Sequence, residues 1–204
     1  TLGGHSAFIV DVNKTEGFHA GRAIKKMGLE GSPLSELYFD NCKIPKENLL
    51  GKAGAGFSMF NYVMKWEVLL SFIINVGEMQ HLIERCIEYS KTRKQFGNAI
   101  GNYQAVSHKI ADMKIALETA KTMLYRAATK FVQGRNVSSD LAIAKVVASE
   151  GFLQCSLNAM QIFGGIGYMK EMGIEKYVRN SVAGKIYSGS SEIQRNTIAS
   201  MLGL

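Results

Sequence analysis

The spacing of the apolar residues changes near residue 52, and this change limits the possible folds more than any other feature of the chain. After it, apolar side chains recur every three or four residues over long stretches, which is the pattern of amphipathic helices. The 204 residues include only two prolines but 21 glycines, so long helices can run uninterrupted and end at glycine turns. We therefore expect a mainly α-helical protein.

The apolar pattern predicts four helices after residue 52. The first runs to about residue 89, a loop over residues 93–102 leads to the second, and Gly134 to Asn136 ends the second. Four long helices with short connections predict an antiparallel four-helix bundle. The first two apolar stripes are Phe57, Phe60, Met64, Leu70, Ile73, Ile74 and Met79, then Val106, Ile110, Met113, Leu117, Ala120 and Leu124; the third helix is expected over 140–163 after a cap at Ser138, Ser139 or Asp140, and the last from Ser190 or Ser191 through Leu202.

The first 52 residues have the character of β-strands. Two short runs, Ala7 to Val12 and Leu34 to Phe39, are rich in β-branched and aromatic residues and are separated by turn residues. About fifty residues of hairpins form a stable sheet domain only with difficulty. We expect residues 1–52 to be the end of a β-domain and residues 53–204 to be a helical domain. Because the chain begins with Thr1 and its opening does not resemble a signal peptide, we expect a fragment or a processed chain.

Composition narrows the class of ligand and the compartment. The formal net charge of +7 suits acidic ligands such as phosphates, CoA or nucleic acid, but the basic residues are dispersed, which argues against nucleic acid. No apolar run reaches the roughly 20 residues of a membrane span, because Ser71 and Asn75 interrupt the longest run. The three cysteines, Cys42, Cys86 and Cys155, show no metal-ligand spacing and indicate a reducing compartment, so we expect a cytoplasmic protein without a metal site.

Four short motifs occur in a fixed order along the chain. Each is weak evidence alone, but their order and spacing resemble the acyl-CoA dehydrogenase family of FAD enzymes. The resemblance covers essentially the whole chain and only the C-terminal half of a family member. The motifs are Met27-Gly28-Leu29 with Gly31-Ser32 and Leu37-Tyr38-Phe39-Asp40; Arg93-Lys94-Gln95-Phe96-Gly97 with Gln104; Gln161-Ile162-Phe163-Gly164-Gly165-Ile166-Gly167-Tyr168; and Ile186-Tyr187-Ser188-Gly189-Ser190-Ser191-Glu192-Ile193-Gln194-Arg195.

The resemblance implies an architecture and a set of partners. Residues 1–52 would belong to the middle β-domain of the family, and residues 53–204 would form its C-terminal helical bundle. The implied protein is a homodimer or homotetramer that binds FAD, oxidises an acyl thioester in fatty acid or amino acid catabolism, and passes electrons to an acceptor such as an electron-transfer flavoprotein. A eukaryotic member would lie in the mitochondrial matrix. We expect this chain alone to bind FAD poorly and to be inactive, because the family's N-terminal segments supply much of the flavin pocket.

The resemblance also implies which residues hold the cofactor. The loop that follows the first bundle helix would reach the FAD of a neighbouring subunit, and the start of the last helix would touch the flavin nucleotide. Simpler interpretations stay open: a solvated basic loop, a glycine cap at the end of the third helix, and a serine cap on the last helix. The implied cofactor residues are Arg93, Gln95, Phe96, Gln104, Gln161, Gly164, Gly165, Ser190 and Glu192.

The catalytic base is the point where this sequence departs from most of the family. Most members carry a glutamate directly after the tyrosine of the last motif, but here the residue is Ser188, whose hydroxyl is too weak a base. Isovaleryl-CoA and long-chain acyl-CoA dehydrogenases carry the base on the first bundle helix, and counting from Gly56 places Glu67 at that position. Glu67 is therefore the candidate base, unless it is an exposed helix residue or pairs with a distant arginine. Tyr187, Ser188 and Gly189 would contact the thioester, with the Ser188 N–H as a carbonyl donor.

The sequence is compatible with three functions. The first is FAD-dependent α,β-dehydrogenation of an acyl-CoA with Glu67 as base. The second is dehydrogenation or oxidation of an acyl or aminoacyl group on a carrier protein, because Val68 and Lys65 replace residues with which the family commonly contacts its substrate. The third is a non-catalytic bundle that has lost its base at Ser188.

Overall fold

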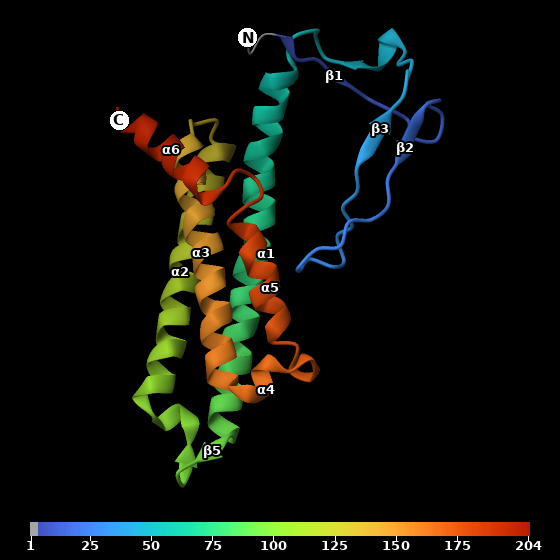
Figure 1. The fold of residues 1–204 in the computed structure, drawn as a ribbon. Coiled ribbons are helices and arrows are strands. Elements are labelled where there is room, and N and C mark those ends of the chain that lie inside the picture. Colours follow the sequence, from blue (N-terminus) through green and yellow to red (C-terminus); the bar gives the residue numbers. More distant parts are fainter. Residues whose placement is uncertain (1–3) are drawn as a thin grey trace. The chain divides into compact units, whose positions relative to one another are not determined.

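The computed structural model describes residues 4–204 (Figure 1). The chain divides into two compact units, residues 1–66 and residues 67–204. The division falls within the long helix α1 (Gly56–Thr92), so the first unit contains the β-strands and the first turns of this helix. The second unit contains everything after them, and each unit is described separately below.

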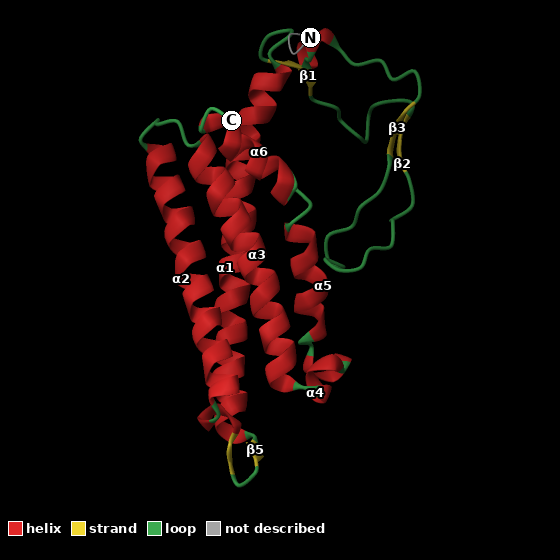
Figure 2. Ribbon diagram, turned by 60° about the vertical axis from the view of Figure 1, so that its left-hand side comes forward, coloured by secondary structure: helices red, strands yellow, loops and turns green. Residues whose placement is uncertain are grey.

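The first unit contains two short antiparallel strand pairs (Figure 2). Strand β1 (Ala7–Phe8) pairs with β4 (Leu49–Leu50), with Ala7 opposite Leu50. Strand β2 (Phe18–Ala20) pairs with β3 (Leu37–Phe39), and the imidazole of His19 stacks on the ring of Tyr38 with 4.8 Å between centroids. The 3-10 turn η2 (Lys46–Asn48) precedes β4. The strands are shorter than the sequence predicts, and the pattern does not reveal β2 because three residues are too few to establish an alternation.

The second unit is a bundle of long helices, as the apolar pattern predicts (Figures 1 and 2). Helix α1 ends at Thr92, α2 spans Gln104–Val132, α3 spans Ser138–Phe163, and α6 spans Ser191–Met201. The connection between α1 and α2 holds the two-residue strands β5 (Lys94–Gln95) and β6 (Asn98–Ala99) and the 3-10 turn η3 (Ile100–Asn102).

Helix α5 (Glu175–Gly184) is the part of the bundle that the sequence did not predict. Its buried face consists of Tyr177, Ser181 and Gly184, so two of the three inward positions are not apolar. The helix is also only ten residues long, and so short a segment with few apolar side chains gives a weak sequence signal. The short helix α4 (Gly165–Tyr168) and the 3-10 turn η4 (Lys170–Met172) connect α3 to α5.

The core of the second unit lies where α1, α2, α3 and α5 meet. Apolar side chains from all four helices fill it, and burial of each large aliphatic or aromatic side chain contributes about 1.5–3 kcal/mol to the free energy of folding. The largest buried apolar side chains include Phe72, Met79, Leu82, Met113, Leu117 and Ile174.

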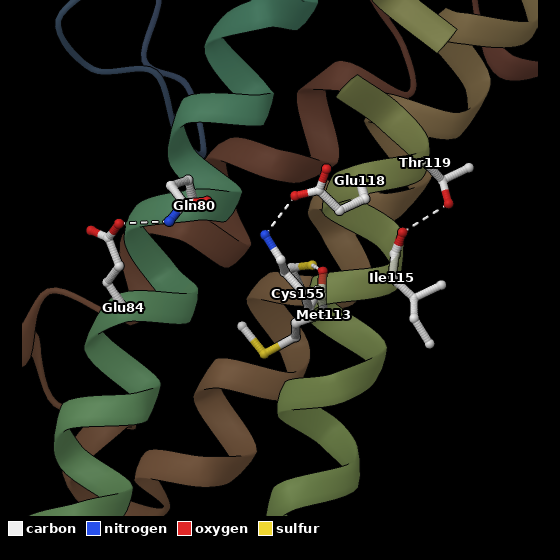
Figure 3. Close-up of polar contacts among 8 residues, drawn as sticks. Gln80, Glu84, Met113, Ile115, Glu118, Thr119 and Cys155 are labelled. Atoms are coloured by element: carbon white, nitrogen blue, oxygen red, sulfur yellow. Dashed lines mark hydrogen bonds and ion pairs between the residues drawn. The ribbon is translucent and has the colours of Figure 1, made fainter. Parts of the chain in front are cut away.

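Polar contacts tie α3 to α2 at two levels. Near the middle of the bundle, the Cys155 thiol donates to the Met113 carbonyl oxygen at 3.7 Å (Figure 3). At the start of α3, the Asp140 carboxylate accepts hydrogen bonds from the Lys130 ammonium at 2.7 and 2.8 Å and pairs with Arg126 at 3.1 Å. The Lys130 hydrogen bond lowers the pKa of Asp140, which indicates that the ionised carboxylate is the form that the fold stabilises.

Helix α1 also has the length and apolar composition of a membrane-crossing helix. The same composition is found in core helices of soluble proteins. Phe72, Met79, Leu82 and Cys86 of this helix are buried within the bundle. The expectation that the protein has no membrane span stays a prediction.

Candidate active site

The structure brings together Glu67, the candidate base, and Ser188, which occupies the position of the base in most family members. Glu67 lies on α1, and Ser188 lies in the turn between α5 and α6, 121 residues further along the chain. The Ser188 hydroxyl donates to Glu67 Oε1, with 2.5 Å between the oxygens. This length is typical of a charge-assisted bond from a hydroxyl to a carboxylate. Glu67 is half-buried, so the alternative of a fully exposed helix glutamate is excluded.

The turn that carries Ser188 has an unusual backbone. Ser188 has φ +55° and Gly189 has φ +81°, so two consecutive residues adopt the left-handed conformation. For a non-glycine residue this conformation costs about 1 kcal/mol or more. The side-chain amide of Gln194 donates to the carbonyl oxygens of Ser188 at 3.1 Å and Gly189 at 3.3 Å. The turn is thus fixed by the helix that follows it.

Tyr187 forms one wall beside the carboxylate. Its ring stacks on the buried Phe72 ring with 5.4 Å between centroids and 25° between planes. Burial raises the pKa of the Tyr187 phenol, and the negative charge of Glu67 raises it further. Tyr187 therefore stays protonated near neutral pH and faces the same small region as Glu67.

Lys145 is a buried cation behind this wall that the sequence reasoning missed. It lies on α3 with 0% of its surface exposed, and its ammonium nitrogen is 5.6 Å from the Phe72 ring centroid. No hydrogen-bond acceptor reaches this nitrogen within the described chain. Burial lowers the pKa of Lys145, while the charges of Glu192 and Glu150 oppose the shift. The sequence signal for this buried cation was the presence of a single lysine within the apolar run from Leu141 to Val147.

The start of α6 lies directly after the Ser188 turn. Ser190 is the N-cap of α6, and its hydroxyl accepts from the Ile193 N–H at 3.5 Å. A hydrogen bond from Ser190 lowers the pKa of Glu192, which is exposed in the first turn. The capping interpretation of Ser190 is confirmed, and capping leaves the exposed side of this turn accessible to a ligand.

The remaining predicted cofactor residues lie at the other end of the bundle. Arg93, Gln95 and Phe96 occupy the β5–β6 hairpin, where the Phe96 ring is 93% exposed, and Gln104 begins α2. The Tyr103 hydroxyl donates to the Gln95 carbonyl oxygen at 3.0 Å and holds the hairpin. Figure 1 shows β5 and α4 at the same end.

Gln161, Gly164 and Gly165 lie at that end as well, on the last turn of α3 and just after it. Tyr89 of α1 stacks on Phe163 at 4.2 Å, so this turn packs on the end of α1. Gly164 has φ +62° and its N–H donates to the Met160 carbonyl oxygen, which confirms the helix-cap interpretation. A Cβ atom on either glycine would meet open space, so the backbone here can be approached by a ligand.

Glu67 and the hairpin are far apart. Glu67 and Thr92 are 25 residues apart on α1, which corresponds to about 38 Å of helix. The structure therefore joins Glu67, Tyr187, Ser188, Gly189, Ser190 and Glu192 in one region and places Arg93, Gln95, Phe96, Gln104, Gln161, Gly164 and Gly165 in another. Within residues 4–204, no group of three or more His, Cys, Asp or Glu side chains could hold a metal ion.

Comparison with known families identifies the class to which this fold and site belong. Residues 54–203 match the family described as acyl-CoA dehydrogenase, C-terminal domain. The chain therefore belongs to the acyl-CoA dehydrogenase family, and the resemblance stated from the motifs is confirmed.

Individual relatives in the family match nearly the whole chain at about 40% identity. It is 40% identical to the L-prolyl-[peptidyl-carrier protein] dehydrogenase of Serratia sp. (strain ATCC 39006), covering 98% of this chain and 52% of the relative. It is 39% identical to an acyl-CoA dehydrogenase of Bacillus subtilis (strain 168), with the same shares of each covered. The chain thus spans about half the length of the curated relatives it matches.

Solved structures give the same result for the fold. PigA with FAD and proline superposes with a TM-score of 0.96 at 39% identity, covering 100% of this chain and 53% of that one. Butyryl-CoA dehydrogenase from Megasphaera elsdenii superposes with a TM-score of 0.95 at 35% identity, with the same coverage. The helical bundle and the strand segments before it therefore have the architecture of this family.

Proposed function

We propose that this chain is part of an FAD-dependent enzyme that dehydrogenates an acyl thioester between its α- and β-carbons, with Glu67 as the base. The observation that carries the proposal is the 2.5 Å contact between Glu67 and Ser188. It places a carboxylate beside the position at which most family members carry their base. A non-catalytic bundle would have no reason to place one there.

The residues of this region have separate tasks. Glu67 removes the proton from the substrate α-carbon and holds it on a carboxylate oxygen. The Ser188 N–H has no backbone acceptor among the described residues, so it can donate to the thioester carbonyl oxygen as negative charge develops there, an effect typically worth about 3–4 kcal/mol per donor. Tyr187, stacked on Phe72, packs against the thioester and excludes water.

The residues at the far end of the bundle fit FAD. The Arg93 guanidinium offers paired donors for phosphate oxygens, the exposed Phe96 ring offers a stacking surface, and the open backbone at Gly164 and Gly165 permits close approach. Gln95, Gln104 and Gln161 add amide groups there, and Ser190 and Glu192 would hold the nucleotide at the other region. Bound FAD would supply the acceptor for the hydride that leaves the β-carbon.

The separation of the two regions supports an oligomer. A span of about 38 Å along α1 exceeds the length of one extended dinucleotide. The hairpin of one subunit would therefore serve the FAD of its neighbour, which requires at least a homodimer and is compatible with a homotetramer.

The relatives indicate the kind of electron acceptor. They include CarC, a subunit of the caffeyl-CoA reductase-Etf complex of Acetobacterium woodii, and a solved structure titled as an electron transferring flavoprotein of Acidaminococcus fermentans. We infer an electron-transfer flavoprotein as the acceptor and a cytoplasmic location, or the mitochondrial matrix in a eukaryote. No nucleic-acid partner is part of the proposal.

A second candidate keeps the chemistry and changes the carrier of the acyl group. The relatives named above include a dehydrogenase of a prolyl group on a peptidyl carrier protein, and another solved relative is titled as the prolyl acyl carrier protein oxidase AnaB. Identities of 40% and 39% to carrier-protein and acyl-CoA enzymes do not separate the two substrates. Val68, where the family usually has an arginine, is buried in the bundle core and cannot contact a CoA phosphate, which favours the carrier-protein substrate.

One experiment tests the proposal and separates the two candidates. The absorbance spectrum of the purified full-length protein should show bound flavin, and the flavin band should bleach when the right thioester is added anaerobically. The panel contains saturated acyl-CoAs and prolyl and acyl groups on a carrier protein. Bleaching by CoA thioesters supports the first candidate, and bleaching only by carrier-bound groups supports the second. A protein without flavin absorbance, or flavin that no thioester bleaches, would refute both.

A further inference from the structure

The Ser188 side chain has a feature that the proposed reaction does not require. Catalysis needs the Ser188 backbone N–H, which any residue other than proline would supply. The structure nevertheless aims the Ser188 hydroxyl at Glu67 Oε1 across 2.5 Å. A hydroxyl in this place can only help the carboxylate as a hydrogen-bond donor, because it is far too weak a base to replace it.

We propose that Ser188 is a positioning residue, whose hydroxyl holds the ionised Glu67 carboxylate in the orientation that reaches the substrate α-proton. The inference rests on the proposed function, in which Glu67 is the base. It adds a task for the side chain at 188 that is separate from the task of its backbone.

Glu67 needs such a donor because its own helix provides none of opposite charge. Its neighbours three and four residues away on α1 are Val63, Met64, Leu70 and Ser71. A glutamate side chain has three rotatable bonds, and a carboxylate free to rotate would spend little time facing the substrate. The hydrogen bond from Ser188, which reaches Glu67 from the turn between α5 and α6, is the contact that restricts this rotation.

Ser188 is suited to the task because hydrogen bonds hold the backbone of its turn. Gln194 binds the carbonyl oxygens of both Ser188 and Gly189. The fit is tight, since a Cβ atom on Gly189 would lie 2.7 Å from the Gln194 amide nitrogen. The Ser188 Cβ is therefore held in place, and only one side-chain torsion has to be set to direct the hydroxyl.

The backbone conformation at Ser188 also indicates a role for its side chain. Ser188 has φ +55°, a conformation that glycine adopts without strain and serine does not. A serine at this position therefore costs stability. A need for the backbone N–H does not explain the serine, because glycine would present the same N–H without strain. The one thing that serine adds is its side chain, and that side chain binds Glu67.

Tyr187 is a titratable group beside this carboxylate, and Lys145 is a second one, packed against the Phe72 ring behind Tyr187. The Tyr187 phenol lies within electrostatic reach of Glu67 in the same turn. The Lys145 ammonium approaches from α3 on the Phe72 ring, which stacks on Tyr187. Neither is a hydrogen-bond donor to Glu67 in the structure, so Ser188 is the group whose removal should release the carboxylate.

The test compares Ser188→Ala and Ser188→Gly in the FAD-loaded full-length protein. Both variants lose the hydroxyl, but alanine keeps the backbone strain and glycine relieves it. We expect both to slow flavin reduction by thioester about 10- to 100-fold. Thioester binding should change much less than the rate of flavin reduction, because the lost hydroxyl contacts Glu67 and not the substrate. Ser156→Ala, which removes a buried hydroxyl bonded to the Phe152 carbonyl oxygen, should match the wild type.

Crystal structures of the wild type and Ser188→Gly provide a readout that does not depend on turnover. The Glu67 carboxylate should hold one orientation in the wild type and lose it in the variant. An unchanged carboxylate orientation, together with an unchanged rate of flavin reduction, would overturn the inference. If the wild type binds flavin but no thioester reduces it, the proposed function fails, and the carboxylate positions still decide whether Ser188 orients Glu67.

Discussion

The Lys145 ammonium nitrogen lies 5.6 Å from the centre of the Phe72 ring, and both residues are completely buried. Phe72 in turn stacks on Tyr187, which stands beside Glu67. A buried cation thus lies next to the candidate active site. Among the described residues its ammonium group has no hydrogen-bond partner, and it packs against the face of the Phe72 ring. A contact of this kind stabilises a desolvated cation by about 2 kcal/mol, which is less than the cost of burying it.

The first prediction concerns the stability cost of Lys145. Burial lowers the pKa of Lys145 from its ordinary 10.5, so between the lowered and the ordinary pKa the folded chain binds fewer protons than the unfolded chain. The free energy of unfolding should therefore rise with pH through that window and level off above pH 10.5. Lys145→Met should remove this rise and be at least as stable as the wild type at neutral pH.

Urea unfolding at a series of pH values measures this effect. Lys114→Met is the matched control, because Lys114 is exposed and pairs with Glu118 within α2; its stability should change by no more than about 0.5 kcal/mol. If the free energy of unfolding of Lys145→Met still rose with pH, the rise would have to come from another titratable group.

The second prediction concerns the join between α2 and α3. The pKa of Asp140 is lowered, chiefly by the hydrogen bond from Lys130. The stabilisation is therefore present above the ordinary pKa of 3.8 and is lost as pH falls through the lowered pKa. Asp140→Asn should lower the free energy of unfolding by about 1.5–3 kcal/mol at pH 7 and by little in strong acid. Thermal unfolding at both pH values tests this, and an equal loss at both would mean that charge is not involved.

The third prediction concerns the base. Glu67→Gln should slow flavin reduction by the thioester substrate by about 10²–10⁴-fold, because amides do not accept the α-proton. Flavin binding should be unchanged, since glutamine has nearly the size and shape of glutamate and Glu67 is not among the residues proposed to hold FAD. Glu84→Gln is the control on the same helix, where Gln80 donates to Glu84 on the exposed surface, and it should reduce its flavin at the wild-type rate. Stopped-flow absorbance distinguishes these outcomes. If Glu67→Gln reduced its flavin at the wild-type rate, Glu67 would not be the catalytic base.

The fourth prediction concerns the thiols. Cys86 and Cys155 are buried, and burial raises the pKa of each to about 12. Cys42 is partly exposed. A thiol reagent such as DTNB should therefore modify Cys42 alone in the native protein and all three after unfolding in guanidinium, because thiolates are the reactive form. In Cys42→Ser the native reaction should disappear. Rapid reaction of three thiols in the native state would contradict the burial.

Local patterns of residues were sufficient to predict the long helices and the family. The spacing of apolar residues predicted α1, α2 and α3, with ends that differ from the observed ends by only a few residues. The predicted buried stripe of α1 was largely wrong, because Phe60, Leu70 and Ile74 are exposed and Phe72, Leu82 and Cys86 are buried instead. Helix α5 could not be predicted, because it is only ten residues long and two of its three buried residues, Ser181 and Gly184, are not apolar. The short strands of the first unit carry too few residues to show an alternation.

The contact between Glu67 and Ser188 depends on long-range packing and could not be predicted from the sequence. Counting along the chain gave Glu67 as a candidate base and left Ser188 as an empty position, with 121 residues between them. Their contact depends on how α5 packs on α3, on the left-handed turn at Ser188 and Gly189, and on the Gln194 amide that holds it. Such long-range packing is set by the sum of many weak interactions across the core, and no local pattern of residues records it. For the same reason, a lysine in an apolar run was visible in the sequence, but its position under Phe72 was not.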